Sequence, residues 1–255
     1  MGKLTVAIIT FNEQKNIKRC LDSIVSIADE IIVVDSFSTD STEEICSAYP
    51  NLVFIKNTFE GHIQQKNFAL EQSTNHFVLS LDADECLNSS LQSKISDLKK
   101  DFVFQAYSFN RLTRYVDQWI KHCGWYPDKK IRLIDKRVAR WGGVNPHDYI
   151  DLDPSIKVHH IAEDILHYSY DSISDHVNQT NKFTTIAAKT AFEKGKKSSF
   201  LTIVIRAYFK FFRDYILKLG FLDGRYGFVI CYINSVYALL KYSKLKDLQE
   251  GKKID

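Results

Sequence analysis

Three carboxylates stand together directly after a short apolar run. The run is Phe77-Val78-Leu79-Ser80-Leu81, and it leads into Asp82-Ala83-Asp84-Glu85. Carboxylates crowded at the end of a buried strand repel one another and lose hydration, so such a cluster is normally tolerated because a cation lies among the oxygens. The pattern therefore predicts that Asp82 and Asp84 hold one Mg²⁺ or Mn²⁺ against a diphosphate. The alternative is an acidic turn that caps a helix beginning near Ser89.

The cluster comes at the end of a regular alternation of predicted elements. The strands are residues 4–10, 30–35, 52–56 and 76–81, and the helices between them are 16–27, 42–49 and 62–72. Strands that are apolar on both faces and alternate with helices indicate a parallel sheet that is covered on both sides. The expected fold class is α/β, with a doubly wound, mostly parallel sheet of the nucleotide-binding type.

Polar side chains follow the first two predicted strands, where an open parallel sheet places its ligand crevice. Thr10, Asn12 and Glu13 come after the first strand and can reach the base and the ribose hydroxyls of a nucleotide. Glu13 can equally cap the next helix. Asp35 and Asp40 follow the second strand, and a carboxylate there can accept from a base N–H or a ribose hydroxyl.

Two basic side chains are candidates for contacting a diphosphate. Lys66 lies on the predicted helix 62–72 and can meet a phosphate, although a lone Lys on a helix is more often only solvated. Arg132, and less readily Lys129 or Lys130, can neutralise diphosphate oxygens when a loop closes.

Beyond residue 100 we expect strands at 106–115 and 130–134, loops at 119–128 and 141–150, and a helix at 172–192. The loops hold aromatic side chains whose faces suit stacking on sugar rings, although core packing explains any one of them equally well. These aromatic residues are Trp119, Trp125, Tyr126 and Trp141.

The strand-end elements, in this order, resemble those of the family 2 inverting glycosyltransferases of the GT-A fold over about residues 4–150. Three later segments resemble a narrower branch, the bacterial lipopolysaccharide inner-core β-glucosyltransferases. These segments are Gly124-Trp125-Tyr126-Pro127, Arg132-Leu133-Ile134 and Gly220-Phe221-Leu222-Asp223-Gly224. The resemblance implies a nucleotide-diphosphate sugar as donor, most simply UDP-glucose, and a divalent metal.

The resemblance also implies roles for single residues. Asp35 would bind the base, Asp82 the ribose or the metal, and Asp84 the metal. His167 follows a possible strand and can be a further metal or diphosphate ligand, or equally a hydrogen-bonded structural histidine. Independently of the resemblance, the stacking faces of Trp125 and Tyr126, in a loop past the metal motif, predict that they contact the acceptor.

An inverting transfer needs a base that takes the proton of the acceptor hydroxyl, and positive charge on the departing diphosphate. For the base we choose Asp148 in Asn145-Pro146-His147-Asp148, which takes the place where the family commonly has His-Glu. Asp128 and Asp151 are rivals. His147 would bind the acceptor or orient the base.

The chain changes character at residue 198. Residues 200–212 are apolar and aromatic apart from Arg206 and Lys210, a Gly-rich break spans 220–227, and fifteen uncharged residues occupy 226–240. That run is shorter than the about 20 residues that cross a bilayer. Cationic residues among Phe, Tyr and Ile suit helices that lie in the membrane interface. The alternative is a helical pair that packs on the catalytic domain or on a dimer partner.

Composition narrows the function classes. The formal net charge of the 255 residues is only +3, which argues against a dedicated nucleic-acid binder. The five cysteines are scattered, without a Cys-x-x-Cys, and are typical of reduced thiols in a cytosolic protein. No apolar signal region follows the N-terminus, and Val6 breaks the myristoylation pattern. We expect a cytoplasmic protein, peripheral on the inner face of the cell membrane.

The sequence thus predicts a GT-A catalytic domain at 1–197, with a nucleotide-binding half at 1–100 and an acceptor half at 101–197. A helical, membrane-associating segment would follow at 198–255. The expected function is metal-dependent transfer of a hexose to a lipopolysaccharide core or another lipid-linked saccharide. The alternatives are a nucleotidyltransferase that makes a nucleotide sugar, and a non-catalytic scaffold that binds one at the membrane.

Overall fold

The computed structural model describes residues 2–144 and 147–254, with the side chain of His147 also outside the described part. The chain forms two compact units. The first, which we call the sheet unit, consists of Met1–Arg111 and Asp128–Tyr168. The second, which we call the helical unit, consists of Leu112–Pro127 and Ser169–Asp255.

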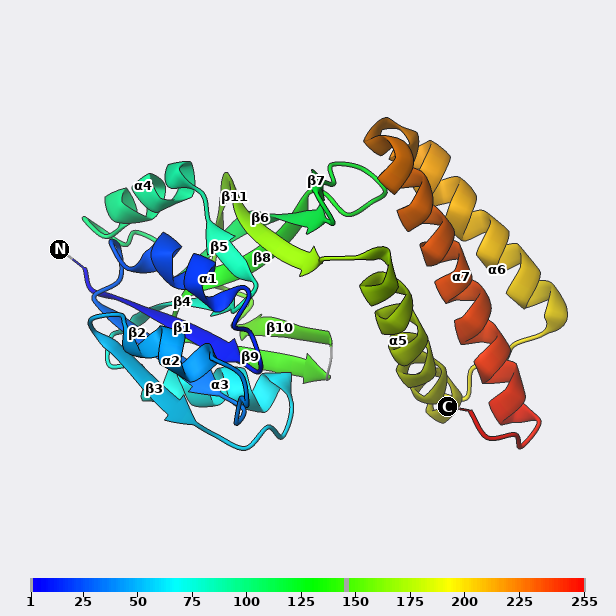
Figure 1. Cartoon of the computed structure of the whole chain (residues 1–255), viewed down its shortest axis with the longest axis horizontal. Coiled ribbons are helices and arrows are strands. Elements are labelled where there is room, and N and C mark those ends of the chain that lie inside the picture. Colours follow the sequence, from blue (N-terminus) through cyan, green and yellow to red (C-terminus); the bar gives the residue numbers. More distant parts are fainter. Residues whose placement is uncertain (1, 145–146, 255) are drawn as a thin grey trace. The chain divides into compact units, whose positions relative to one another are not determined.

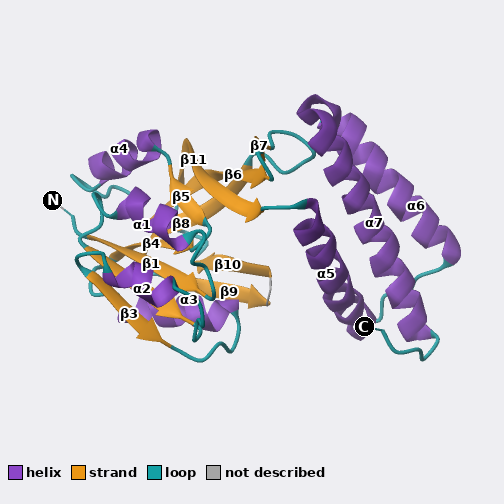
Figure 2. Ribbon diagram, viewed as in Figure 1, coloured by secondary structure: helices purple, strands orange, loops and turns teal. Residues whose placement is uncertain are grey.

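Four parallel strands form one half of the large sheet, in the order β3-β2-β1-β4 (Figures 1 and 2). They are β1 (Leu4–Thr10), β2 (Glu30–Asp35), β3 (Leu52–Lys56) and β4 (Phe77–Asp82). The connections are α1 (Ile17–Ile24), α2 (Thr42–Ser47) and α3 (His62–Gln72). The predicted alternation is confirmed, with boundaries that differ by a few residues at the helix ends.

The sheet continues in the order β8-β6-β11-β5. β8 is antiparallel to both β4 and β6, and β5 is antiparallel to β11. The added strands are β5 (Glu85–Leu87), β6 (Ala106–Tyr115), β8 (Asp128–Asp135) and β11 (Val158–Tyr170), and β7 (Gln118–Trp119) pairs with β6. Among the described residues the sheet therefore has nine strands. The strands expected at 106–115 and 130–134 are confirmed. The helix α4 (Ser89–Leu98) is capped by Asn88, whose side chain accepts from the Leu91 N–H, and not by the acidic cluster.

The prediction of a loop at 141–150 is wrong. In its place β9 (Ala139–Val144) and β10 (His147–Leu152) form a separate antiparallel hairpin. Trp141 and Ile150 lie opposite each other in its register, and both are buried. Glycines and polar residues between these two side chains hid the strand pattern from the sequence.

Both faces of the parallel strands are covered, which explains why those strands have no polar face. Alternate residues of β1, such as Val6 and Ile8, pack with α1 and α4 in one core cluster. Ala7, between them, belongs to a second cluster with α3 and the β9–β10 hairpin. Full burial of each large apolar side chain contributes about 1.5–3 kcal/mol. The two clusters hold the carboxyl ends of β1, β2 and β4 in one row.

The helical unit contains α5 (Ile173–Glu193), α6 (Phe200–Phe212) and α7 (Gly224–Gln249), and α7 packs against both of the others. Two short turns, at Arg213–Leu217 and Gly220–Asp223, join α6 to α7. The Gly-rich break is shorter than expected, because α7 begins at Gly224. Gly227 lies inside the helix, where a Cβ would fall 1.9 Å from the Gly220 carbonyl oxygen, so the glycine permits this close approach. No helix in the described residues is long and apolar enough to cross a membrane.

Candidate active site

The loops after β1 and β2 are joined by hydrogen bonds. The Asn12 N–H donates to Ser38 Oγ at 2.7 Å, and the Thr39 N–H donates to Asn12 Oδ1 at 2.8 Å. The Gln14 N–H donates to Asp40 Oδ2 at 3.1 Å. Asn12 has φ +55°, a left-handed conformation that Asn tolerates better than most residues. The two predicted nucleotide-contacting loops therefore form one structure.

Two other residues predicted to contact the nucleotide form hydrogen bonds with residues close to them in the chain. Asp35 is fully buried, and its two carboxylate oxygens accept from the Ser38 N–H and hydroxyl, which shapes the turn after β2. The Glu13 side chain accepts from the Asn16 side chain, and its backbone carbonyl accepts from the Asn16 and Ile17 N–H groups at the start of α1. Thr10 is buried, and among the described residues its hydroxyl has no hydrogen-bond partner. Contacts of these residues with a base or ribose stay predictions.

Lys66 links two of the predicted site carboxylates. Its Nζ lies 3.0 Å from Asp82 Oδ1, at the end of β4, and 2.7 Å from Asp148 Oδ2, on β10. The Trp141 ring centroid lies 4.3 Å from the same Nζ, within the range of a cation–π contact. Lys66 is only 4% exposed, so the solvated alternative weighed for it from the sequence is wrong. One buried ammonium contacts both carboxylates, although Asp148 lies 82 residues from Lys66 in the chain.

Arg132 is a buried residue of the strand that the sequence predicts at 130–134. It lies within β8, where its Nη2 is 3.0 Å from Asp82 Oδ2 and 2.7 Å from Glu85 Oε1. Arg111 Nη1 lies 3.5 Å from the same Glu85 oxygen. The acidic cluster is thus balanced by lysine and arginine side chains of the chain itself.

The ion pairs decide the charge states at this site. Burial would raise the pKa of Asp82, but Lys66 and Arg132 outweigh it, and the net pKa lies far below the usual range. The same balance, with Lys66 as the main cation, lowers the pKa of Asp148. Burial would lower the pKa of Arg132, but Glu85 and Asp82 raise it above the ordinary arginine value. The carboxylates are therefore ionised and the guanidinium is charged at neutral pH.

Asp84 is turned to a different partner from Asp82. Its Oδ2 lies 3.2 Å from His167 Nε2, on β11, and its backbone carbonyl accepts from the Tyr168 N–H at 2.9 Å. The pairing of β5 with β11 sets this neighbourhood. Within the described parts of the chain, no group of three or more His, Cys, Asp or Glu residues is arranged to hold a metal ion. The structure brings together one carboxylate and one imidazole here.

The rivals to Asp148 as catalytic base lie in other surroundings. Asp128 Oδ2 accepts from Arg111 Nη2 at 2.7 Å and from its Nε at 3.0 Å. Asp151 is exposed on β10, opposite Arg140. Of these three carboxylates, Asp148 is the one whose contacting cation, Lys66, also contacts Asp82.

The comparisons with known proteins decide the family. Residues 5–150 match the family model described as glycosyl transferase family 2. The chain belongs to glycosyl transferase family 2. An uncharacterized glycosyltransferase, RP128 of Rickettsia prowazekii, is 31% identical over 263 residues, which covers 97% of this chain and 88% of the relative. The predicted fold class, an α/β GT-A fold with a C-terminal helical extension, and the predicted enzyme class, a glycosyltransferase, are confirmed.

Two further similarities extend over almost the whole chain. The lipopolysaccharide core biosynthesis glycosyltransferase LpsC of Rhizobium meliloti is 26% identical over 254 residues, covering 95% of this chain and 91% of LpsC. The crystal structure of S. aureus TarS residues 1–349 superposes with a TM-score of 0.48 at 15% identity, covering 99% of this chain and 93% of that chain.

The predicted acceptor residues fall in different places in this family 2 glycosyltransferase. His147 has its side chain outside the described residues. Trp125 lies in the helical unit, in an aromatic cluster with Tyr170 and His176 at centroid distances of 5.8 and 5.7 Å, as in the packing alternative. Tyr126, next to it, is half-buried. Acceptor contacts for all three stay predictions.

Sequence reasoning missed several residues that build the site. Glu85 is fully buried and joins Arg132 to Arg111, a role that its place beside two other carboxylates concealed. The Asn67 amide brackets the backbone of Trp141 through two hydrogen bonds of 2.9 Å, which attaches the hairpin to α3. No local pattern signals such pairs, since the partners are far apart in sequence.

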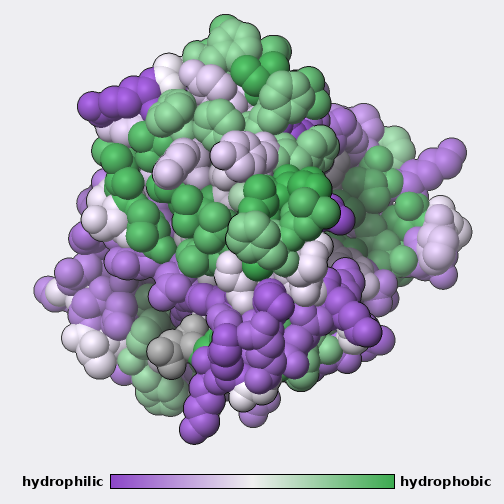
Figure 3. Space-filling view, turned by 90° about the vertical axis from the view of Figure 1, so that its right-hand side faces the viewer, coloured by the Kyte–Doolittle hydropathy of each residue, from purple (hydrophilic) through white to green (hydrophobic). Residues whose placement is uncertain are grey.

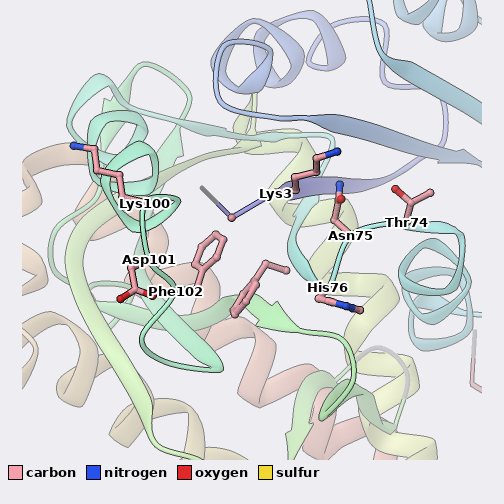
Figure 4. A pocket seen from close by; sticks show the side chains of 9 residues that line it. Lys3, Thr74, Asn75, His76, Lys100, Asp101 and Phe102 are labelled. Carbon is pink, nitrogen blue, oxygen red and sulfur yellow. The ribbon is translucent and has the colours of Figure 1, made fainter.

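A pocket lies at the other end of the sheet, where β1 and β4 begin (Figure 4). Its lining includes Lys3, His76, Phe77 and Phe102, and the two phenylalanine rings stack with centroids 3.9 Å apart. A parallel α/β sheet binds its ligand at the carboxyl ends of the strands, so this pocket is not the candidate active site.

Proposed function

We propose that this chain is a metal-dependent inverting glycosyltransferase that moves a hexose from a UDP-sugar, UDP-glucose in the first instance, to a lipid-linked saccharide. One observation carries the proposal. The Lys66 ammonium lies within 3.0 Å of two carboxylates, Asp82 of the acidic cluster and Asp148 on β10. A lipopolysaccharide core is the favoured acceptor, because the similarity to LpsC covers 95% of this chain.

The interlocked loops after β1 and β2 suit a nucleotide. Phe11 and Phe37 are 57% and 53% exposed on these loops, although aromatic rings are ordinarily buried. An exposed aromatic face can stack on a base. Lys66 and Arg132 supply fixed positive charge where the diphosphate of a bound nucleotide would lie. Charge-assisted hydrogen bonds to phosphate oxygens are strong.

Asp84 and His167 fit a divalent cation by the chemistry of their donors. Mg²⁺ and Mn²⁺ accept carboxylate oxygen, Mn²⁺ also accepts imidazole, and such ions commonly take only one or two protein ligands together with phosphate oxygens and water. The 3.2 Å between Asp84 Oδ2 and His167 Nε2 suits two ligands of one ion. When bound, the cation supplies positive charge to the departing diphosphate.

Asp148 is the proposed base. Its lowered pKa keeps it ionised at neutral pH, so its oxygen can accept the proton of the acceptor hydroxyl as that hydroxyl attacks the anomeric carbon. Lys66 orients the carboxylate through the 2.7 Å contact. The same ammonium contacts Asp82, so the base and the acidic cluster are held in one geometry.

The direct test measures UDP release from a panel of UDP-sugars with Mn²⁺, with and without a lipopolysaccharide-core acceptor. We expect slow release without acceptor and faster release with it. Asp84→Asn should lower both by at least about a hundredfold, whereas Asp148→Asn should lower mainly the acceptor-dependent rate, by about 10²–10⁴-fold. The exposed Asp97→Asn on α4 is the matched control and should change neither rate.

Three outcomes would contradict the proposal. Pyrophosphate release from a nucleoside triphosphate would indicate a nucleotidyltransferase. Tight binding of a UDP-sugar with no turnover across the acceptor panel would indicate a scaffold. Unchanged activity of Asp148→Asn would transfer the role of base to another carboxylate, with Asp128 the next to substitute.

A further inference from the structure

The helical unit carries an apolar stripe that the described protein does not cover. Leu201, Ile205, Tyr208, Phe212 and Ile216 recur every three or four residues, so they share one side of α6 and of the turn that follows it. All five are exposed, Tyr208 to 76% and Leu201 to 65%. The stripe continues onto Phe221 and Leu222, which are also exposed. We call these seven residues the apolar stripe.

The opposite side of α6 is occupied, so the stripe is not one half of the packing with α7. Ala207 is buried, and its carbonyl accepts from Ser235 Oγ, on α7, at 2.9 Å. Asp214 is 1% exposed and accepts from Asn234 Nδ2 at 3.3 Å. Figure 3, which views the molecule from the side of α6 and α7, shows hydrophobic side chains gathered over a broad region in its upper half.

The segment that carries the stripe is strongly cationic. Residues 194–225 contain eight Lys or Arg and only two acidic residues, Asp214 and Asp223. Both acidic residues are buried, and Asp214 is paired with Lys210 and Arg213, each at 2.8 Å. The exposed charge of the segment is therefore positive throughout.

This combination favours lipid over a second copy of the chain. Interfaces between proteins are depleted in Lys, whereas helices that lie in a membrane interface place Lys and Arg beside exposed Phe, Leu and other apolar residues. A soluble monomer rarely leaves so many contiguous apolar side chains in water. The exposed apolar side chains lie along one side of α6, so a helix lying in the plane of the interface is the arrangement that suits this surface.

We infer that the apolar stripe on α6 and the two following turns inserts into the headgroup region of an anionic lipid bilayer, with the lysines and arginines of 194–225 contacting the lipid phosphates. The surface is independent of the sugar-transfer chemistry, but it deepens the proposed function, since a lipid-linked acceptor is presented at such a bilayer. α6 would lie parallel to the membrane plane.

The first test is sedimentation of the full chain with vesicles, without nucleotide or metal. We expect binding to equimolar phosphatidylcholine and phosphatidylglycerol, and much weaker binding to phosphatidylcholine alone or at high salt. Tyr208→Asp should weaken binding by at least about tenfold, because it replaces an inserted side chain by an anion. Val103→Asp is the matched control, since Val103 is 72% exposed and lies in the sheet unit, and it should bind as the parent does.

The second test separates charge from apolar insertion. Lys197→Gln with Lys218→Gln should weaken binding to the anionic vesicles by roughly tenfold or more. The matched pair Lys94→Gln with Lys157→Gln removes two exposed lysines of the sheet unit and should leave binding unchanged.

Two results would overturn the inference. One is equal or absent binding of the parent and Tyr208→Asp to anionic vesicles. The other is a dimer, seen by analytical ultracentrifugation, that Tyr208→Asp converts to a monomer while the parent ignores vesicles, since a second copy would then cover the stripe. Neither result depends on UDP release, so the inference can fail while the proposed function stands. Unchanged UDP release by Tyr208→Asp would show that the active site of this variant is intact.

Discussion

The sheet unit is marked by a network of buried ion pairs, whereas the helical unit is marked by a row of exposed apolar side chains. In the sheet unit Lys66, Glu85 and Arg132 are buried to 4% exposure or less, and each is paired with an opposite charge. In the helical unit large apolar side chains such as Tyr208 and Leu201 stand in solvent. Burying charge costs free energy, and so does exposing apolar surface. The first cost is offset by ion pairs within the protein, and we infer that the second is offset by a lipid surface outside it.

The largest effect on stability should come from breaking the buried charge network. Glu85→Ala leaves Arg132 and Arg111 without their shared carboxylate, and the loss of one partner from a buried pair costs about 3–5 kcal/mol. We expect that decrease in the free energy of unfolding, measured by urea denaturation. Glu71→Ala, an exposed site on α3, is the control and should change it by less than about 0.5 kcal/mol. A loss below about 1 kcal/mol for Glu85→Ala would mean that water can replace the carboxylate.

The helical unit should respond to pH through one buried histidine. His176 is 4% exposed, and burial lowers its pKa to about 4. Its Nδ1 lies 3.1 Å from the Tyr115 hydroxyl. An unfolded histidine titrates near about 6.5, so between these pH values the unfolded state binds the extra proton. The stability contribution is therefore complete above about pH 6.5 and is lost as the pH falls toward 4.

The full effect is on the order of 3 kcal/mol, of which about 2 kcal/mol is lost by pH 5. Urea denaturation at pH 7 and pH 5 should show a steeper loss for the parent than for His176→Gln, while the partly exposed His76→Gln should follow the parent. Equal pH slopes for the parent and His176→Gln would show that His176 is protonated without cost in the folded state.

The difference between the units also explains which features the sequence could predict. The strands of the parallel half are continuous apolar runs such as 30–35, and the helices carry a clear period, so local patterns sufficed. The β9–β10 hairpin escaped prediction because its buried pair, Trp141 and Ile150, is separated by glycine and polar residues.

The sequence predicts which residues belong to the site, but it does not predict which of them contact one another. The strand-end carboxylates followed from the sheet pattern, and Lys66 was named as a phosphate ligand. Its position between Asp82 and Asp148 depends on the packing of α3 against β9, which lies some seventy residues away, and on the hairpin partner β10. Pairings across such separations are decided by tertiary packing, and no local period encodes them.

A smaller effect should separate binding from stability within the sheet unit. Phe11→Ala removes an exposed ring that we propose stacks on the base, so UDP affinity should fall by about 1–3 kcal/mol, at least roughly fivefold. Calorimetry measures this change. The melting temperature without ligand should stay unchanged, because the ring is more than half in solvent. A lower melting temperature with unchanged affinity would indicate that Phe11 supports the loop and does not contact the base.

The smallest expected effect is on stability when a residue of the apolar stripe is replaced. Tyr208→Ser should change the free energy of unfolding by no more than about 0.5 kcal/mol, since this stripe residue has no cover to lose in the protein alone. Ile230→Ala, at a fully buried position of α7 in the same unit, should cost about 2–5 kcal/mol by leaving a cavity. Both values come from urea denaturation of the full chain without lipid. A decrease in the free energy of unfolding for Tyr208→Ser that approached that of Ile230→Ala would mean that the stripe is packed against protein in solution. This is the alternative in which the helical pair packs on the catalytic domain or on a dimer partner. A near-zero cost together with lost vesicle binding can be explained only by a partner outside the protein, because the substitution then removes free energy from the bound state and none from folding.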